Sequence, residues 1–431
     1  MPASRILTLP NCSHDNLSDL ISFNVILQSR WPIVRMVVRS KLMRELIEAE
    51  WKLLQLAKQL HPQDPSSTEA HDDVDIIAFD TPIPNERVPN VIPNKEISTL
   101  SIHAIKACRK GNSQVDTADT LPIVLLHGYG TSGVIYYRNL IPLAIGCFVS
   151  TGAIATVYAI DNMGCGLSSR ISMEQIKDRR PEAITQVAVD SLEAWRDANG
   201  LEKFVLVAHS IAAIHAVAYC QQYPKRVEQL VLLSPAGVTC PKQRRFSFGR
   251  SMLRCCYKNG ISIASLPDTI IKGIVYHSIK LSLPSSIDEK KALIQYHYAN
   301  SRVANYYEKS MFCFIDHRGN AMTDAVATCD KISQLKIPSV SLIYGDNRLD
   351  FIDVKGGIET VERCNKQQHD VTSSTASTTH RAPRVTLQQI INARHALMFD
   401  RQNGLFESIL SKTIQDGRAS TAMSFTPQKR T

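Results

Sequence analysis

The sequence of 431 residues lacks several patterns that would assign it to a cofactor or to the cell exterior. Its eleven cysteines include no C-x-x-C pair, and their odd number argues against a disulfide framework, so reduced thiols in an intracellular compartment fit better. No His, Cys and carboxylate residues have metal-ligand spacing, and we expect neither a metal nor a cofactor. The P-loop pattern G-x-x-x-x-G-K-[ST] is also absent, and we expect no nucleotide or nucleic-acid partner.

The chain also lacks a clear secretory signal or membrane span. Residues 140–160 carry no charge over 21 positions, which is long enough to cross a bilayer. However, Pro142, Gly146 and Gly152 interrupt this run, which favours a helix end, a loop and a buried strand. The formal net charge of +9 favours contact with anionic surfaces such as phospholipid.

Residues 204–223 contain the most informative stretch. Phe204 to Ala208 is an apolar, β-branched run typical of a buried parallel strand, and residues 211–223 are apolar on all sides, as in a buried helix. A turn of two residues between them predicts a nucleophile elbow with Ser210 at its apex. Alanines 208 and 212 replace the usual glycines, a strained but permitted substitution. The alternative is an ordinary helix N-cap serine.

From about residue 97 the chain alternates strands and helices, which predicts an α/β fold with a mostly parallel sheet and helices on both faces. We expect strands near 98–105, 122–127, 154–160, 204–208, 229–233, 338–344 and 385–391. We expect helices near 136–145, 182–199, 211–223 and 403–415.

The predicted organisation has five parts. Residues 1–94 form an N-terminal region, in which 30–60 is an amphipathic helix, either interfacial or packed on the domain, and 61–94 is a linker rich in proline and acids. Residues 95–237 and 337–416 form the two parts of the core, and 238–336 form a cap inserted between them. Within the second part, 364–384 is expected to be a disordered insertion, since it contains a run of Ser and Thr. The tail 417–431 is expected to be disordered.

An attacking serine requires a base, an acid and oxyanion donors, and in this kind of fold the acid and histidine follow the serine in that order. His395 follows a predicted strand and is the expected base, since His369 and His380 flank the Ser/Thr-rich segment. The acid is one of three aspartates after the strand 339–344, namely Asp346, Asp350 and Asp353. The amides of Tyr129 and Ile211 are the expected oxyanion donors.

Several segments together resemble a family of lipid-metabolising α/β-hydrolases that contains N-acyl-phospholipid lipases, cardiolipin deacylases and the co-activator of adipose triglyceride lipase. They are LLHGYGTS at 125–132, YAIDNMGCGLSSR at 158–170, VLVAHS at 205–210, LVLLSPAGV at 230–238, YGDNRLDFID at 344–353 and HALMFD at 395–400. The resemblance implies the α/β-hydrolase fold with an inserted cap. It also implies Asp353 as the acid, with Asp350 as the alternative, and an H-x-x-x-x-D motif formed by His395 and Asp400.

The resemblance implies a serine hydrolase that cleaves acyl ester or amide bonds of (lyso)phospholipids or related lipids through a Ser-His-Asp triad. One alternative is a lysophospholipid acyltransferase that uses acyl-CoA. Another is a non-enzymatic co-activator of a partner lipase on lipid droplets, although Ser210 is present where co-activator members have asparagine. The expected location is intracellular and cytoplasmic, peripheral on lipid droplets, endoplasmic reticulum or mitochondrial membranes.

Overall fold

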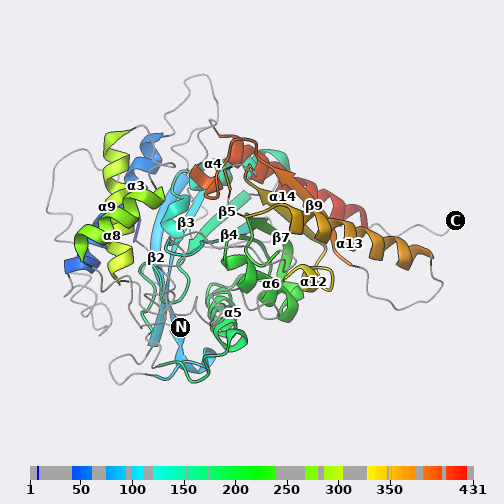
Figure 1. Ribbon diagram of the computed structural model, residues 1–431, viewed down its shortest axis with the longest axis horizontal. Helices are drawn as coiled ribbons and strands as arrows, with labels where there is room; N and C mark the ends of the chain where they lie inside the picture. The colour runs from blue at the N-terminus through cyan, green and yellow to red at the C-terminus, as the bar shows by residue number, and fades with distance from the viewer. Residues whose placement is uncertain are drawn as a thin grey trace.

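The structure is a computed structural model, and Figure 1 shows the arrangement of its helices and strands. It describes residues 7–8, 41–60, 74–93, 99–109, 120–151, 154–171, 175–238, 267–279, 286–303, 328–346, 349–350, 352–373, 382–399 and 404–424. The candidate motif residue Asp400 lies outside these ranges.

A nine-stranded sheet with the order β1-β2-β3-β5-β4-β6-β7-β8-β9 forms the centre of the molecule. Its first three strands are antiparallel to their neighbours: β1 (Leu7–Thr8), β2 (Val74–Pro84) and β3 (Thr99–Arg109). The remaining strands are parallel: β4 (Thr120–Leu126), β5 (Ile154–Ile160), β6 (Phe204–His209), β7 (Val227–Leu233), β8 (Ser339–Tyr344) and β9 (Arg384–Gln389). This confirms the expected mostly parallel sheet.

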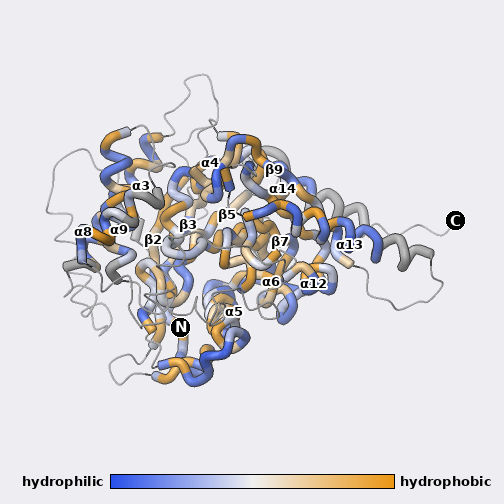
Figure 2. The backbone as a smooth tube through the Cα atoms, viewed as in Figure 1, coloured by the Kyte–Doolittle hydropathy of each residue, from blue (hydrophilic) through white to orange (hydrophobic). Residues whose placement is uncertain are grey.

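Helices cover both faces of the sheet. Alternate residues of each buried strand face opposite sides, so they contact different sets of helices. Leu206 and Leu230 pack with helices α5 (Pro181–Ala198), α6 (Ala212–Gln222), α12 (Cys329–Ile332) and α13 (Lys355–Ser373). Val205 and Val231 pack with α3 (Lys41–Leu60), α4 (Leu140–Thr151), α9 (Ile287–Val303) and α14 (Leu405–Ser424). The central strands are coloured mainly hydrophobic in Figure 2, which fits burial on both faces.

The N-terminal region differs from its predicted form. The segment 61–94 is not a linker throughout, since 74–84 form β2, which pairs with β3 along its whole length. Helix α3 packs on the domain, with its apolar stripe in the core next to α9, rather than lying free for an interface. The apolar period predicted a helix over 30–60, which is confirmed for 41–60, while residues 30–40 lie outside the described residues. The period does not decide which surface covers the helix, because this depends on the packing.

Two further expectations need correction, and a third is confirmed. The insertion expected at 364–384 is helical in its first part, because α13 continues to Ser373. The tail expected from 417 is helical to Ser424, where α14 ends. The uncharged run 140–160 divides into α4 and β5, as predicted. None of the helices in the described part of the chain is both long and apolar enough to span a membrane.

Short 3-10 turns occur at Asn85–Arg87, Gly133–Tyr136, Pro224–Arg226 and Leu397–Phe399. Two described helices belong to the predicted cap, α8 (Asp268–Ile279) and α9. They pack against each other, and α9 packs against α3 (Figure 1). The cap helices and the N-terminal helix therefore form one helical group, which reaches the loop after β4 through α9.

Candidate active site

Ser210 occupies a sharp turn between β6 and α6. Its φ angle is +55°, a left-handed conformation that costs a non-glycine residue about 1–2 kcal/mol. Three backbone hydrogen bonds hold it there: its amide donates to the Leu233 carbonyl at 2.9 Å, and its carbonyl accepts from the amides of Ala236 at 3.0 Å and Ala213 at 3.1 Å. Alanines 208 and 212 on either side are fully buried. The elbow geometry is thus compatible with alanine at both usual glycine positions.

His395 joins Ser210 to an aspartate. The Ser210 hydroxyl donates to His395 Nε2 at 3.0 Å, and His395 Nδ1–H donates to Asp350 Oδ1, also at 3.0 Å. The histidine lies in the loop after β9, and its side chain is 17% exposed, whereas the Asp350 side chain is fully buried. The three groups therefore form a hydrogen-bonded series from a solvent-reachable hydroxyl to a buried carboxylate.

The Asp350 carboxylate is held by four donors. Oδ1 accepts from His395 and from the Ile352 amide at 2.9 Å, while Oδ2 accepts from the Ser234 hydroxyl at 2.6 Å and the Gly345 amide at 3.3 Å. Burial alone would raise the pKa of Asp350, but the hydrogen bond and charge of His395, together with the other donors, lower it below its usual range. Asp350 is therefore a stable anion that fixes the imidazole tautomer.

The preference for Asp353 as the acid is wrong in this geometry. Its Oδ1 accepts from the Lys355 amide at 3.0 Å, at the beginning of α13, which is ordinary aspartate turn chemistry. Asp346 accepts from the Asn392 amide at 3.1 Å and so ties two loops together. Asp350, the alternative in the sequence analysis, is the aspartate placed on His395.

His209, next to the serine, supports the base. Its Nε2–H donates to the His395 carbonyl at 2.9 Å, and the two rings lie 4.8 Å apart between centroids. Burial, and then the neighbouring His395, lower the pKa of His209 to about 3, so this ring stays neutral at physiological pH. His209 therefore positions His395 through a hydrogen bond and carries no charge that would act on it.

The loop after β4 passes directly over the serine. A Cβ on Gly128 would lie 2.8 Å from His209 Nδ1 and 3.0 Å from Ser210 Cβ, so only glycine fits there. Tyr129 follows in the same turn and is 36% exposed. Within the described residues the Ile211 amide, at the beginning of α6, donates to no protein acceptor. Both predicted oxyanion donors thus belong to segments that adjoin Ser210.

The segment 128–133 has the spacing G-x-G-x-x-G, so composition alone does not exclude a dinucleotide loop there. Its geometry argues against one. The segment opens into the short 3-10 turn Gly133–Tyr136 instead of directly into a long helix, and the Gly133 amide donates to Asp161 Oδ1 at 2.6 Å. The amide that would meet a phosphate is already bonded.

Helix α9 holds this loop from the cap side. Asn300 Nδ2 donates to the carbonyls of Gly130 and Thr131, both at 3.3 Å, and Asn300 Oδ1 accepts from the Gly166 amide at 3.2 Å. Tyr296 and Ser132 also share a hydrogen bond between their hydroxyls. The cap is thereby fastened to the segment that carries Tyr129.

Sequence reasoning missed Ser234, His209 and Asn300 as parts of the site. Ser234 could have been found, because it directly follows β7 and polar residues at the carboxyl ends of parallel strands converge at one edge of the sheet. Asn300 lies on a cap helix with no such signal. One buried group of possible metal ligands, Glu50, His103 and Asp161, lies outside the triad and is considered below.

Comparison with known proteins supports the fold. A family model described as alpha/beta hydrolase fold matches residues 122–256. A structure of 2-hydroxy-6-oxo-6-phenylhexa-2,4-dienoate hydrolase from Rhodococcus superposes with a TM-score of 0.51 at 14% identity, over 80% of this chain and 99% of that one. A membrane phospholipase A described as a bacterial virulence factor gives 0.52 at 14% identity, over 94% and 99%. The chain has the α/β-hydrolase fold.

Among curated proteins, this chain is similar over part of its length to three relatives. It is 36% identical to abhydrolase domain-containing protein abhd-5.2 of Caenorhabditis elegans over 33% of this chain and 28% of the relative. It is 36% identical to human 1-acylglycerol-3-phosphate O-acyltransferase ABHD5 over 27% and 30%. It is 32% identical to human (lyso)-N-acylphosphatidylethanolamine lipase over 28% and 31%. The matches thus span less than a third of each relative, and this confirms the resemblance over a partial region.

Proposed function

We propose that this chain is a serine hydrolase that cleaves acyl ester or amide bonds of (lyso)phospholipids or related lipids. The observation that carries the proposal is the hydrogen-bonded series Ser210–His395–Asp350 on a left-handed elbow. The lipid substrate class is supported by the partial similarity to a protein named as a (lyso)-N-acylphosphatidylethanolamine lipase.

The first half-reaction forms an acyl-enzyme. Ser210 Oγ attacks the acyl carbonyl carbon while His395 Nε2 takes the hydroxyl proton. The charge that develops on the carbonyl oxygen is stabilised by the amides of Tyr129 and Ile211. The intermediate then collapses, the bond to the leaving alcohol or amine breaks, and His395 returns the proton to that leaving group.

The second half-reaction releases the acid. A water molecule attacks the acyl carbon as His395 Nε2 takes a proton from it, and the bond to Ser210 Oγ breaks as Oγ regains a proton. Asp350 remains ionised throughout, since its lowered pKa and its four donors favour the anion. It holds Nδ1–H toward itself and so leaves Nε2 free to accept.

We place this activity at a lipid surface. Trp51 on α3, Tyr276 on α8 and Ile287 at the beginning of α9 are 38%, 54% and 67% exposed, and the three helices pack together. Apolar side chains on one helical group, in a chain with a net charge of +9, suit peripheral contact with anionic phospholipid.

The test is labelling of the purified full chain with a fluorophosphonate probe, which reacts only with an activated serine. We expect the wild type to be labelled, Ser210→Ala to be unlabelled, and Ser408→Ala, which removes an exposed serine on α14, to be labelled like the wild type. A folded wild type that is not labelled, or labelled Ser210→Ala, contradicts the proposal. A positive result leads to a screen of (lyso)phospholipids with defined head groups.

A second candidate is acyl transfer from acyl-CoA to a lysophospholipid, which the similarity to a protein named as an acylglycerol-phosphate acyltransferase favours. The same acyl-enzyme would then be resolved by a lysophospholipid hydroxyl in place of water. Labelled acyl-CoA with lysophosphatidic acid distinguishes the two: labelled phosphatidic acid supports transfer, and labelled free fatty acid alone supports hydrolysis. A non-enzymatic role as co-activator of a partner lipase is supported if activity of that lipase rises equally with wild type and Ser210→Ala.

A further inference from the structure

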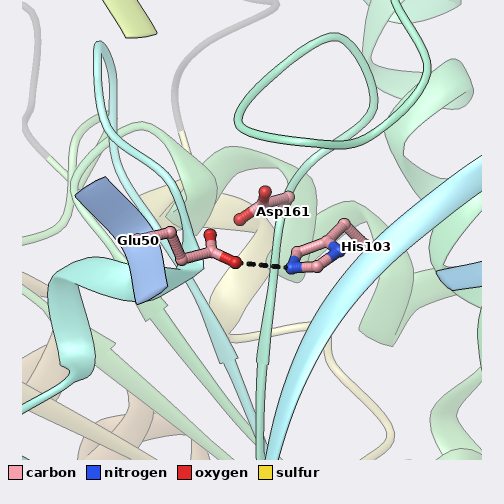
Figure 3. A group of neighbouring side chains, drawn as sticks. All are labelled: Glu50, His103 and Asp161. Carbon is pink, nitrogen blue, oxygen red and sulfur yellow. Dashed lines mark hydrogen bonds and ion pairs between the residues drawn. The ribbon is translucent and has the colours of Figure 1, made fainter. Parts of the chain in front are cut away.

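Three buried side chains from separate parts of the chain meet beside the sheet (Figure 3). Glu50 comes from α3, His103 from β3, and Asp161 follows the end of β5. One possible ligand atom from each lies within 4.8 Å of the other two. Sequence spacing could not reveal this group, because its members are brought together only by the packing of α3 against the sheet.

His103 is oriented by a carboxylate on one side. Its Nδ1 is 2.8 Å from Asp80 Oδ1 on the neighbouring strand β2, and its Nε2 faces Glu50 Oε1 at 2.9 Å. Asp80 is the more exposed partner, with 58% of its side chain accessible, compared with 5% for Glu50. A carboxylate that accepts from the rear nitrogen is the arrangement by which proteins fix the tautomer of a metal-binding histidine.

The carboxylates of Glu50 and Asp161 can each accept a further hydrogen bond or bind a cation. Glu50 Oε2 is buried and has no hydrogen-bond partner within the described residues. Each Asp161 oxygen accepts one backbone amide, from Gly133 at 2.6 Å and from Leu167 at 2.7 Å, which leaves a lone pair on each. An unsatisfied oxygen on a buried carboxylate is costly and calls for a cation or a donor.

We propose that Glu50, His103 and Asp161 bind a divalent transition-metal ion, with Zn²⁺ as the first candidate, and that Asp80 supports His103 from behind. Imidazole nitrogen and carboxylate oxygen are both protein ligands of Zn²⁺, so the group offers three, and a water or the second Glu50 oxygen would complete four. Ligand atoms around tetrahedral Zn²⁺ lie about 3.3 Å apart. The Glu50–His103 pair, at 2.9 Å, therefore has to open by a few tenths of an ångström, and the Asp161 oxygen, within 4.8 Å of the other two, has to move inward.

A proton on His103 Nε2 is the alternative to a bound metal ion in this group. Burial lowers the pKa of His103, but Glu50 and Asp80 more than offset this and raise it well above its usual value. A proton on Nε2 bonds Glu50 Oε1 alone and leaves Oε2 without a partner. Arg170 is a half-buried cation whose hydrogen bonds, in the described structure, go to the carbonyls of Gly164 and Gly166 rather than to either carboxylate. An ion at the centre would satisfy both carboxylates at once.

The metal would have a structural role that is separate from the triad. It would join α3 to β3 and to Asp161, whose carboxylate also holds the Gly133 amide at the end of the loop after β4. Bound ions at such sites stabilise the folded state because the unfolded chain does not present the ligands together. The proposal therefore stands whether or not Ser210 proves to be a nucleophile.

The experiment uses the full chain with exposed thiols alkylated, stripped with EDTA, then given Zn²⁺ and passed through gel filtration before metal analysis. We expect about one retained ion per chain in the wild type, none in Glu50→Gln or His103→Gln, and about 10–100-fold weaker binding in Asp80→Asn. Glu48→Gln, an exposed change on the same helix, is the matched control and should bind like the wild type.

Thermal unfolding with Zn²⁺ and with EDTA gives a second measurement that does not depend on metal analysis. Zn²⁺ should raise the midpoint of the wild type and of Glu48→Gln, and leave Glu50→Gln unchanged. A wild type that retains no ion and whose midpoint is the same in Zn²⁺ and EDTA shows that the group holds a proton only, and this overturns the proposal. Retention in Glu50→Gln equal to that in the wild type also overturns it.

Discussion

Two histidines of this molecule are oriented by an aspartate at Nδ1, and they differ in what faces Nε2. At His395, Asp350 is the buried partner and the Ser210 hydroxyl faces the other nitrogen. At His103, Asp80 is the outer partner and the Glu50 carboxylate faces the other nitrogen. The same histidine–aspartate pairing therefore has different consequences. The Ser210 hydroxyl can lose its proton to the ring of His395, whereas the ionised Glu50 carboxylate has no proton to transfer to His103.

A histidine–aspartate pair alone therefore does not mark a catalytic site. His395 adjoins a strained elbow and a glycine that lies against the nucleophile. The glycines beside the His103 group, Gly133 and Gly166, lie against the Asp161 carboxylate instead of a hydroxyl. Substitutions that remove the partners of each histidine should therefore have different effects on activity and on stability.

Removing the group that faces Nε2 of His395 should have the largest effect. Ser210→Ala should lower kcat by about 10⁶-fold, because the attacking oxygen is lost while binding remains. The measurement is hydrolysis of a chromogenic short-chain ester together with circular dichroism to verify folding. Activity within ten-fold of wild type would show that Ser210 is not the nucleophile.

Removing the charge behind His395 should have the next largest effect. Asp350→Asn should lower kcat by about 10⁴-fold, because an amide stabilises the wrong imidazole tautomer. Asp353→Asn, three residues away, should change kcat by less than about three-fold, because its carboxylate accepts from the Lys355 amide rather than from His395. Equal losses in both variants would contradict the assignment of the acid.

Breaking the His103 pair should affect stability rather than chemistry. In metal-free buffer, Glu50→Ala should lower the free energy of unfolding by about 3–5 kcal/mol, because it leaves a buried His103 with only an outer partner. Urea unfolding measures this, with Glu48→Ala as the control. Fluorophosphonate labelling well below the unfolding transition should remain. A variant as stable as the control would show that the pair contributes little.

Loosening the loop beside the serine should give a moderate loss. Asn300→Ala removes two side-chain donors from the carbonyls of Gly130 and Thr131. We expect kcat to fall about ten-fold with little change in KM, less than the 10²–10³-fold that loss of a whole oxyanion donor costs. Gln295→Ala, exposed on the same helix, serves as the control. A change confined to KM would indicate a role in substrate binding instead.

The pH dependence of stability should give the smallest effect. The pKa of Asp350 is lower in the folded chain than the value of about 3.9 in the unfolded chain. Its ionised form therefore stabilises the fold above about pH 4, and this contribution is lost as pH falls through the folded pKa. The stability difference between wild type and Asp350→Asn should shrink on acidification, as urea unfolding at several pH values would show. A difference that grows would reverse the sign.

The parallel strands β4 to β8 were predictable because each is a short run of β-branched and apolar residues between turns. Strand β2 was not, because its prolines and aspartates are typical of a linker. It lies near the edge of the sheet, between β3 and the two-residue strand β1, where such residues are tolerated. Composition alone does not distinguish an edge strand from a connecting segment.

The nucleophile and base of the candidate site followed from local signals, namely a strand–turn–helix pattern and a histidine just past a strand. The acid did not, because Asp346, Asp350 and Asp353 share one loop and only its backbone path decides which carboxylate meets His395. The buried group at Glu50 was beyond reach for the same reason, since it depends on helix α3 packing against strands far along the chain.

The packing of α3 against α9 also bears on synthesis of the protein. More than half of the given sequence lies between α3 and α9, so α9 is synthesised well after α3. At about 5–20 residues per second, on the order of tens of seconds separate the two. During that interval the stripe formed by Leu46, Leu53, Leu54 and Ala57 can pack against the sheet and α4 but lacks its contacts with α9. The surface of α3 that α9 covers in the finished fold therefore stays open until the cap has been synthesised.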